Sequence, residues 1–143
     1  RSREARVLCE RFQQEYDALI DYKSSAPLSL QSTHRVLYCI WKDPWMTVSR
    51  DTYIARMLEL IGWQQWLVNS TARYPAFEWD TKMLTAIDEI LLSSEPYSFT
   101  QTHVDALERQ TGKRVRLVDG EMLSWYGSRA ILGLRYLREL LQQ

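Results

Sequence analysis

Apolar side chains recur at helical spacing in several segments of the chain, with polar residues on the opposite face. In residues 4–23 an apolar stripe runs from Ala5 to Ile20, as in an amphipathic helix with one buried face. Similar patterns predict helices at residues 51–61, 80–87, 100–110 and 130–141. Candidate residues to begin or end these helices are Asp51, Thr100, Thr102, Gly62 and Gly112.

Short aliphatic and β-branched runs separate these helices. They predict strands at residues 35–41, 66–69, 89–94 and 115–119. A parallel neighbour needs a crossover of a dozen or more residues, which this spacing provides. Runs such as Ile90-Leu91-Leu92 lack alternation, as expected for strands covered on both faces. The sequence therefore predicts an α/β fold: a three-layer sandwich with a small parallel sheet of about four strands, preceded by a helix.

Composition and charge exclude several classes of function. The chain has 143 residues, enough for one domain with its own core. Lys plus Arg and Asp plus Glu number 18 each, so the net charge is zero, and no basic run favours nucleic acid. No apolar stretch approaches the roughly 20 residues that cross a bilayer. We therefore expect neither nucleic-acid binding nor membrane insertion.

Two features bear on the compartment. The chain begins at Arg1 and not at a methionine, so we expect a mature or trimmed fragment, and a missing signal peptide decides nothing. Cys9 and Cys39 each lie in an apolar pattern. We expect them to be buried thiols and not a disulfide, so they do not indicate the compartment either.

Aromatic residues are concentrated where the predicted strands end. The loops 41–48, 69–79, 94–99 and 119–127 follow the four strands, and ligands of such sheets bind at this carboxyl edge. These loops hold nine of the 17 aromatic residues: Trp41, Trp45, Tyr74, Phe77, Trp79, Tyr97, Phe99, Trp125 and Tyr126. Exposed aromatic rings suit flat ligands or partner surfaces. We expect a binding face, the alternative being that several rings fold inward and plug the end of the sheet.

Catalytic motifs are weak in this sequence. Residues 124–128 (SWYGS) only superficially match a nucleophile elbow, because the Gly-x-Ser-x-Gly pattern is absent. His34 and His103 are the two histidines, and we expect both at the surface. No glycine-rich phosphate loop and no spacing typical of metal ligands is present. We therefore expect no enzyme, no metal site and no cofactor; an enzyme domain using Ser93, Ser124 or Asp119 stays as an alternative.

Acidic residues also lie at the carboxyl edge. For Glu95 and Asp119 we expect a structural role, either capping the next helix or accepting hydrogen bonds from loop amides. Asp80 differs, because it is expected at the start of a helix on an exposed corner, where it can meet a basic partner.

Four motifs, in order along the chain, resemble one known family. They are residues 35–48 (RVLYCIWKDPWMTV) followed by DTYI at 51–54 and LELIG at 58–62, then Tyr74-Pro75, residues 93–97 (SSEPY) and residues 119–127 (DGEMLSWYG). The chain resembles the solute-binding proteins for cobalamin and ferric siderophores, the helical-backbone metal receptors of ABC importers. The resemblance covers nearly the whole chain.

That family has two α/β lobes joined by one long helix, with the ligand between the lobes. The resemblance implies that residues 1–26 are the end of the connecting helix and residues 34–143 the C-terminal lobe, while the N-terminal lobe is missing. It also implies a periplasmic or lipid-anchored protein that serves an ABC importer permease. By the same resemblance, Asp80 would dock with the permease. The ligand-binding residues would be Trp41, Trp45, Met46, Tyr74, Tyr97, Trp125 and Tyr126.

The leading hypothesis is therefore a non-catalytic lobe that binds cobalamin, haem or a ferric siderophore. We favour a corrinoid or another macrocycle, because the edge is aromatic and not basic, whereas many ferric siderophores are anionic and favour Arg and Lys. Lys42, Arg73 and Arg129 could still supply positive charge. The alternative is a protein–protein interaction module that uses the same aromatic edge.

Overall fold

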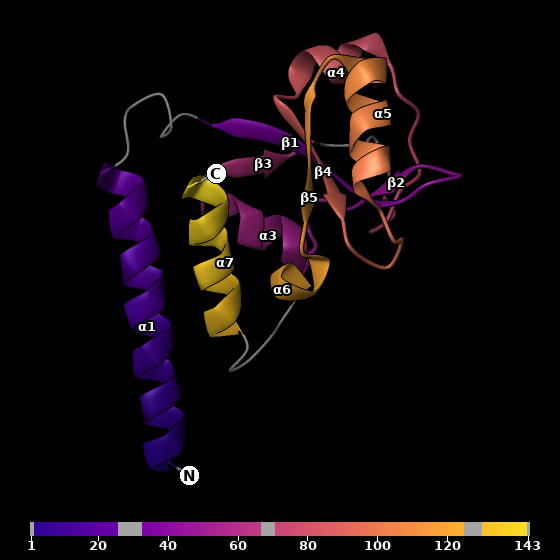
Figure 1. Ribbon diagram of the computed structural model, residues 1–143. Coiled ribbons are helices and arrows are strands. Elements are labelled where there is room, and N and C mark those ends of the chain that lie inside the picture. Colours follow the sequence, from indigo (N-terminus) through magenta and orange to yellow (C-terminus); the bar gives the residue numbers. More distant parts are fainter. Residues whose placement is uncertain (1, 26–32, 67–70, 125–129, 143) are drawn as a thin grey trace.

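The structure is a computed structural model that describes residues 2–25, 33–66, 71–124 and 130–142. The helices are α1 (Ser2–Ser25), α3 (Tyr53–Glu59), α4 (Thr81–Ala86), α5 (Gln101–Thr111), α6 (Gly120–Ser124) and α7 (Ala130–Gln142). The strands are β1 (His34–Trp41), β2 (Met46–Thr47), β3 (Trp63–Gln65), β4 (Glu89–Ser93) and β5 (Arg114–Val118). Helices and strands alternate through most of the chain (Figure 1).

The strands form one sheet in which β3, β1, β4 and β5 are parallel neighbours. The short β2 adds an antiparallel pairing at the far end of β1, with Cys39 opposite Thr47. The predicted parallel sheet of about four strands is confirmed, and β2 is an addition within a segment that the sequence indicated as a loop.

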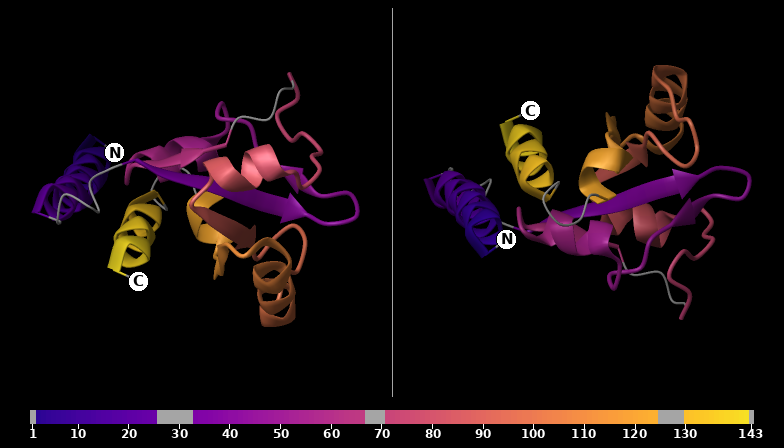
Figure 2. Two further views of the ribbon diagram at one scale, coloured as in Figure 1. Left: turned by 90° about the horizontal axis from the view of Figure 1, so that it is seen from above. Right: turned by 90° about the horizontal axis from the view of Figure 1, so that it is seen from below.

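Helices cover both faces of the sheet, which gives the predicted three layers. Residues of β1 alternate between two cores: Val36 and Tyr38 face the core shared with α1, α3, α6 and α7. Leu37 and Cys39 face the core shared with α4 and α5. In both views of Figure 2, α1 and the β1–β2 hairpin lie at opposite ends of the molecule.

A buried glutamine joins the two strands that share one side of β1. There β1 changes partner from the parallel β3 to the antiparallel β2, and the ladder is interrupted. Gln65 fills the interruption: its Oε1 accepts a hydrogen bond from the Tyr38 N–H at 2.9 Å. Its Nε2 donates to the Thr47 hydroxyl at 2.7 Å and to the Val48 carbonyl at 3.1 Å. A buried side-chain amide is thereby fully used, as buried polar groups require.

The observed elements differ from the sequence prediction at three places. Thr52, and not Asp51, caps α3, because its hydroxyl accepts from the Ala55 N–H while Asp51 pairs with Arg56 at 2.6 Å. Strand β3 occupies 63–65, before the predicted strand 66–69, of which residues 67–69 lie outside the described residues. A hydrophobicity pattern did not indicate β3, because two of its three residues are glutamines. The first turns of the expected loop 119–127 form α6.

Neither cysteine is in a disulfide, as expected, but only one thiol is buried. Cys39 lies within the sheet, and burial raises the pKa of its thiol far above the ordinary value. The expectation for Cys9 is wrong. It lies in the exposed N-terminal half of α1, which the described residues of the lobe do not cover.

A buried ion pair closes the opposite, amino-terminal end of the sheet. The Glu89 carboxylate is fully buried and accepts hydrogen bonds from the Arg116 guanidinium and, at 2.8 Å, pairs with the His34 ring. The guanidinium also lies 4.9 Å from the centre of the Trp63 ring. Burial raises the pKa of Glu89, but the His34 and Arg116 hydrogen bonds outweigh it and hold the pKa below its ordinary value. His34, expected at the surface, is partly buried, with 33% of its side chain exposed.

Candidate functional site

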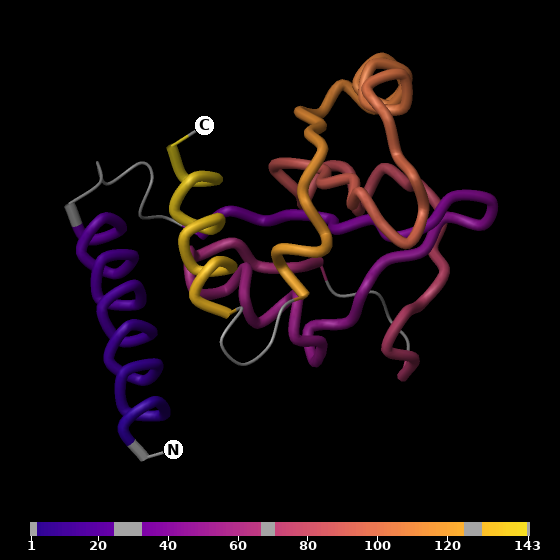
Figure 3. The backbone as a smooth tube through the Cα atoms, turned by 60° about the horizontal axis from the view of Figure 1, so that its bottom comes forward, coloured from indigo at the N-terminus to yellow at the C-terminus, as the bar shows by residue number. Residues whose placement is uncertain are grey.

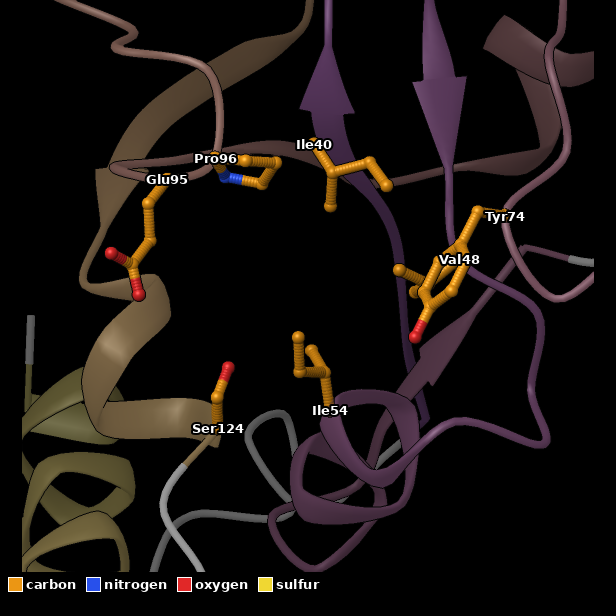
Figure 4. A pocket seen from close by; sticks show the side chains of 7 residues that line it. All are labelled: Ile40, Val48, Ile54, Tyr74, Glu95, Pro96 and Ser124. Carbon is orange, nitrogen blue, oxygen red and sulfur yellow. The ribbon is translucent and has the colours of Figure 1, made fainter.

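A pocket of about 420 Å³ opens at the carboxyl end of the sheet. Ligands of open α/β sheets bind at this end, and the volume lies within the range of small-molecule sites. Figure 4 shows the side chains arranged around the opening. The lining residues are Ile40, Val48, Ile54, Tyr74, Glu95, Pro96 and Ser124.

The alternation of β1 decides which side chain enters the pocket. Ile40, near the end of the strand, packs on the α3 side and lines the pocket. The next residue, Trp41, must then lie on the other face, where its ring meets Tyr97 edge-on at 5.2 Å. Val48 after β2 and Ile54 in the first turn of α3 complete an aliphatic wall. The walls are therefore branched aliphatic groups from β1, from α3 and from the segment between β2 and α3.

The loop after β4 places a carboxylate beside this wall. Ser93 donates its hydroxyl hydrogen to the Glu95 carbonyl at 2.6 Å and accepts from the Glu95 N–H at 3.3 Å. These bonds hold the backbone, and the Glu95 carboxylate lies across the opening from Tyr74 (Figure 4). The Glu95 side chain lines the pocket and does not cap the next helix, since Thr100 and His103 form the capping box of α5.

The other predicted capping residue is confirmed. Asp119 accepts a hydrogen bond from the Met122 N–H at 3.1 Å, which caps α6. Nearby, burial raises the pKa of the Tyr38 hydroxyl far above its ordinary value. The hydrogen bond with Ser93 opposes this rise, and the charges of Glu95 and Asp119 add to it. Tyr38 thus stays protonated and donates to the Ser93 Oγ at 2.9 Å.

Several of the predicted aromatic residues form a cluster over the α4/α5 core. Trp45 stacks on Phe99 at 5.8 Å and meets Trp79 edge-on at 5.1 Å. Phe77 meets both Trp45 and Trp79, and Phe99 is only 6% exposed. Phe99 therefore folds inward, as the alternative expected for some of these rings, whereas Trp45, Phe77 and Trp79 are partly buried against the same core. The ligand-binding role of Trp45 remains a prediction.

The remaining predicted residues are spread over the carboxyl end. Tyr74 lines the pocket and is 50% exposed. Trp41, 38% exposed, and Tyr97 form a pair outside the pocket lining. Met46 belongs to β2 and pairs with Ala76. Trp125 and Tyr126 lie outside the described residues. The ligand-binding roles of these residues remain predictions.

Asp80 lies where the sequence predicted it. It is exposed and caps α4, since one carboxylate oxygen accepts from the Met83 N–H at 2.7 Å. The aliphatic lining residues were not anticipated. Alternation within β1 could have indicated Ile40, but Val48, Ile54 and Pro96 carry no local signal, because only the folded chain brings them together.

The residues proposed for catalysis are engaged in backbone hydrogen bonds. Ser124 donates to the Gly120 carbonyl at 2.6 Å, and the buried Ser93 donates to the Glu95 carbonyl. His103 caps the first turn of α5. Across the described ranges, no group of three or more His, Cys, Asp or Glu residues is arranged to hold a metal ion.

The fold is similar to one lobe of several solved periplasmic binding proteins. A possible iron-binding periplasmic protein from Staphylococcus epidermidis ATCC 12228 matches with a TM-score of 0.73 and 16% identity over 96% of this chain and 55% of its own. The periplasmic heme binding protein HutB of Vibrio cholerae matches with a TM-score of 0.68 and 18% identity, over 99% of this chain and 58% of its own. The periplasmic vitamin B12 binding protein BtuF of Vibrio cholerae matches with a TM-score of 0.62 and 15% identity, over 91% of this chain and 50% of its own.

At sequence identities of 15–18%, these matches show a shared fold and no more. They confirm, for the fold, the resemblance seen in the sequence motifs. The chain spans about half the length of the solved proteins it matches. No model of a known protein family matches the sequence, and no curated protein does. Within the described ranges, none of the helices combines the length and hydropathy of a membrane-spanning segment.

Proposed function

We propose that this chain is the C-terminal lobe of the substrate-binding component of an ABC importer, and that it binds a corrinoid or another metal chelate in the pocket at the carboxyl end. The observation that carries this proposal is the shared fold: proteins described as binding vitamin B12, heme or siderophores each match this chain over about half of their length.

The pocket supports a ligand with a large apolar surface. Four of its seven lining residues are aliphatic or proline, and Tyr74 adds an exposed ring. Rigid apolar walls with a few polar groups are typical of small-molecule sites. One lobe leaves the pocket open on one side, so a second lobe would have to close over the ligand for high affinity.

The packing and exposure of helix α1 support the proposal of a second lobe. It packs along α7, and an ion pair between Glu15 and Arg135 at 2.7 Å joins the two helices. Its N-terminal half extends beyond α7 (Figure 3). There Val7, Leu8 and Phe12 are 45%, 39% and 39% exposed. Residues 1–26 would thus be the end of the connecting helix, and the missing N-terminal lobe would cover this apolar stripe.

Docking to the importer completes the proposal. The exposed Asp80 at the start of α4 suits a basic residue on the permease, where a charged contact at the rim would mainly guide the encounter. Such a protein acts outside the cytoplasmic membrane, so the proposed location is the periplasm, with or without a lipid anchor.

Equilibrium dialysis against cyanocobalamin, haemin and the neutral ferric chelate ferrichrome tests this function. We expect at least one to bind the chain and to quench its tryptophan fluorescence. Tyr74→Ala should then weaken binding about tenfold, since an exposed ring lost from a pocket is worth about 1–1.5 kcal/mol. Leu132→Ala, which truncates an exposed side chain on α7, should leave affinity unchanged. A folded chain that binds none of the three at millimolar concentration would refute the proposal.

A further inference from the structure

One acidic group stands in the otherwise uncharged pocket. Among the described residues that line it, Glu95 alone carries a charge, and the others are aliphatic, proline or hydroxyl side chains. In Figure 4 the Glu95 carboxylate lies at one side of the opening, and Val48 and Tyr74 lie at the other side. A ligand that fills the pocket must therefore lie against this carboxylate.

Several contacts hold the backbone of Glu95 in place. The Glu95 backbone is held by Ser93 through both its N–H and its carbonyl. On the other side Gly120 is packed so closely that a Cβ there would lie 3.3 Å from the Glu95 carbonyl oxygen. Pro96 follows directly and restricts the loop further. The anchored backbone places Glu95 beside the pocket, and its side chain is one of the lining groups.

Among the described residues, none of the ion pairs involves Glu95. The second carboxylate, Asp119, lies near enough that both charges act on Tyr38. Lys42 and Arg73, which the sequence offered as positive charges, are not among the lining residues, and Arg129 lies outside the described residues. When a ligand displaces water from the pocket, the carboxylate needs a hydrogen-bond donor or a cation in return.

We propose that the pocket selects neutral or cationic chelates that present an N–H or ammonium group to Glu95, and that it discriminates against chelates with carboxylate or other anionic groups. This inference rests on the proposed function and adds the charge class of the ligand. Two like charges a few ångströms apart near a protein surface repel strongly enough to lower affinity about tenfold or more. The same distance gives a comparable gain to a cation.

Matched ligand pairs that differ in charge test this selection. The pairs are cyanocobalamin and its monocarboxylic acid, haemin dimethyl ester and haemin, and ferrioxamine B and its N-acetylated form. In each pair the first member is the less negative or more positive. The chain should bind the first member more tightly. Glu95→Gln should shift the affinity ratio about tenfold toward the second member, and added salt should reduce the difference in the parent chain.

Glu78→Gln is the control, because Glu78 is an exposed acid that does not line the pocket; its ratios should equal those of the parent chain. If chelates bind but Glu95→Gln leaves every ratio unchanged, or if the parent chain prefers the more negative members, the charge selection is wrong while the proposed function stands. If no member of any pair binds, the proposed function itself fails.

Discussion

Replacing Arg116 by leucine should lower the free energy of unfolding by about 3–5 kcal/mol at pH 7. The Glu89 carboxylate has no exposed surface, and Arg116 supplies two of its hydrogen bonds. Without the guanidinium, the buried Glu89 charge keeps, among the described residues, the His34 ring and the more distant Arg114 as partners. Urea denaturation followed by circular dichroism measures the loss.

Arg114→Leu is the matched control. Its side chain is 56% exposed and lies 3.7 Å from the same carboxylate, so we expect a loss of about 1 kcal/mol or less. At acid pH, the difference in free energy of unfolding between Arg116→Leu and the parent chain should become smaller. The lowered pKa of Glu89 stabilises the parent chain above the ordinary carboxyl value of 4.5, and this contribution is lost as the pH falls through the lowered pKa. Equal losses for the two variants would contradict the buried pair.

Gly120→Ala should destabilise the lobe by about 3 kcal/mol through overpacking. A Cβ at this position would lie 2.1 Å from the Ser93 Oγ and 3.2 Å from the Tyr38 hydroxyl oxygen. Both groups are buried and hydrogen-bonded to each other, so neither can move without losing that bond. The same substitution should also disturb the loop that carries Glu95, because that loop depends on Ser93.

Gly112→Ala is the control, because it measures the cost of backbone strain at a glycine where an added Cβ meets no neighbour. Gly112 ends α5 with φ +71° and would have nothing within 4 Å of an added Cβ. Strain alone should lower stability there by about 1 kcal/mol. Adding Ser93→Ala to Gly120→Ala should recover part of the loss, since the nearest clashing atom is then gone. If both glycine variants lost the same free energy, the close packing at Gly120 would be disproved.

The layered fold could be read from the sequence because its signals are local. Helical stripes, aliphatic runs and the spacing between them record burial directly, and Thr100 and Gly112 end α5 as predicted. Strand β3 could not be predicted in this way. Gln65 is polar in the sequence but buried in the structure, because it replaces hydrogen bonds of the interrupted ladder beside β1. A buried polar residue whose partners lie far along the chain gives no hydrophobic signal.

The location of the site was predictable, but its lining was not. Counting aromatic residues in the loops indicated the carboxyl end of the sheet, where the pocket lies. The count could not show that Trp45 would stack on Phe99, because whether a ring faces solvent or a neighbouring ring depends on contacts between separate loops. For the same reason, the sequence predicts only a structural role for Glu95, and it is the fold that places its side chain opposite Tyr74.

The central claim is that a metal chelate occupies the pocket between Ile40, Ile54 and Glu95. Methyl-labelled isoleucine resonances, recorded with paramagnetic ferrichrome and with its diamagnetic gallium analogue, test it most directly. The claim predicts that ferrichrome broadens Ile40 and Ile54 most strongly, while Ile87 and Ile90, in the α4/α5 core, are least affected. At ferrichrome concentrations where dialysis shows binding, strongest broadening at Ile87 and Ile90, or equal spectra with the two chelates, would contradict it.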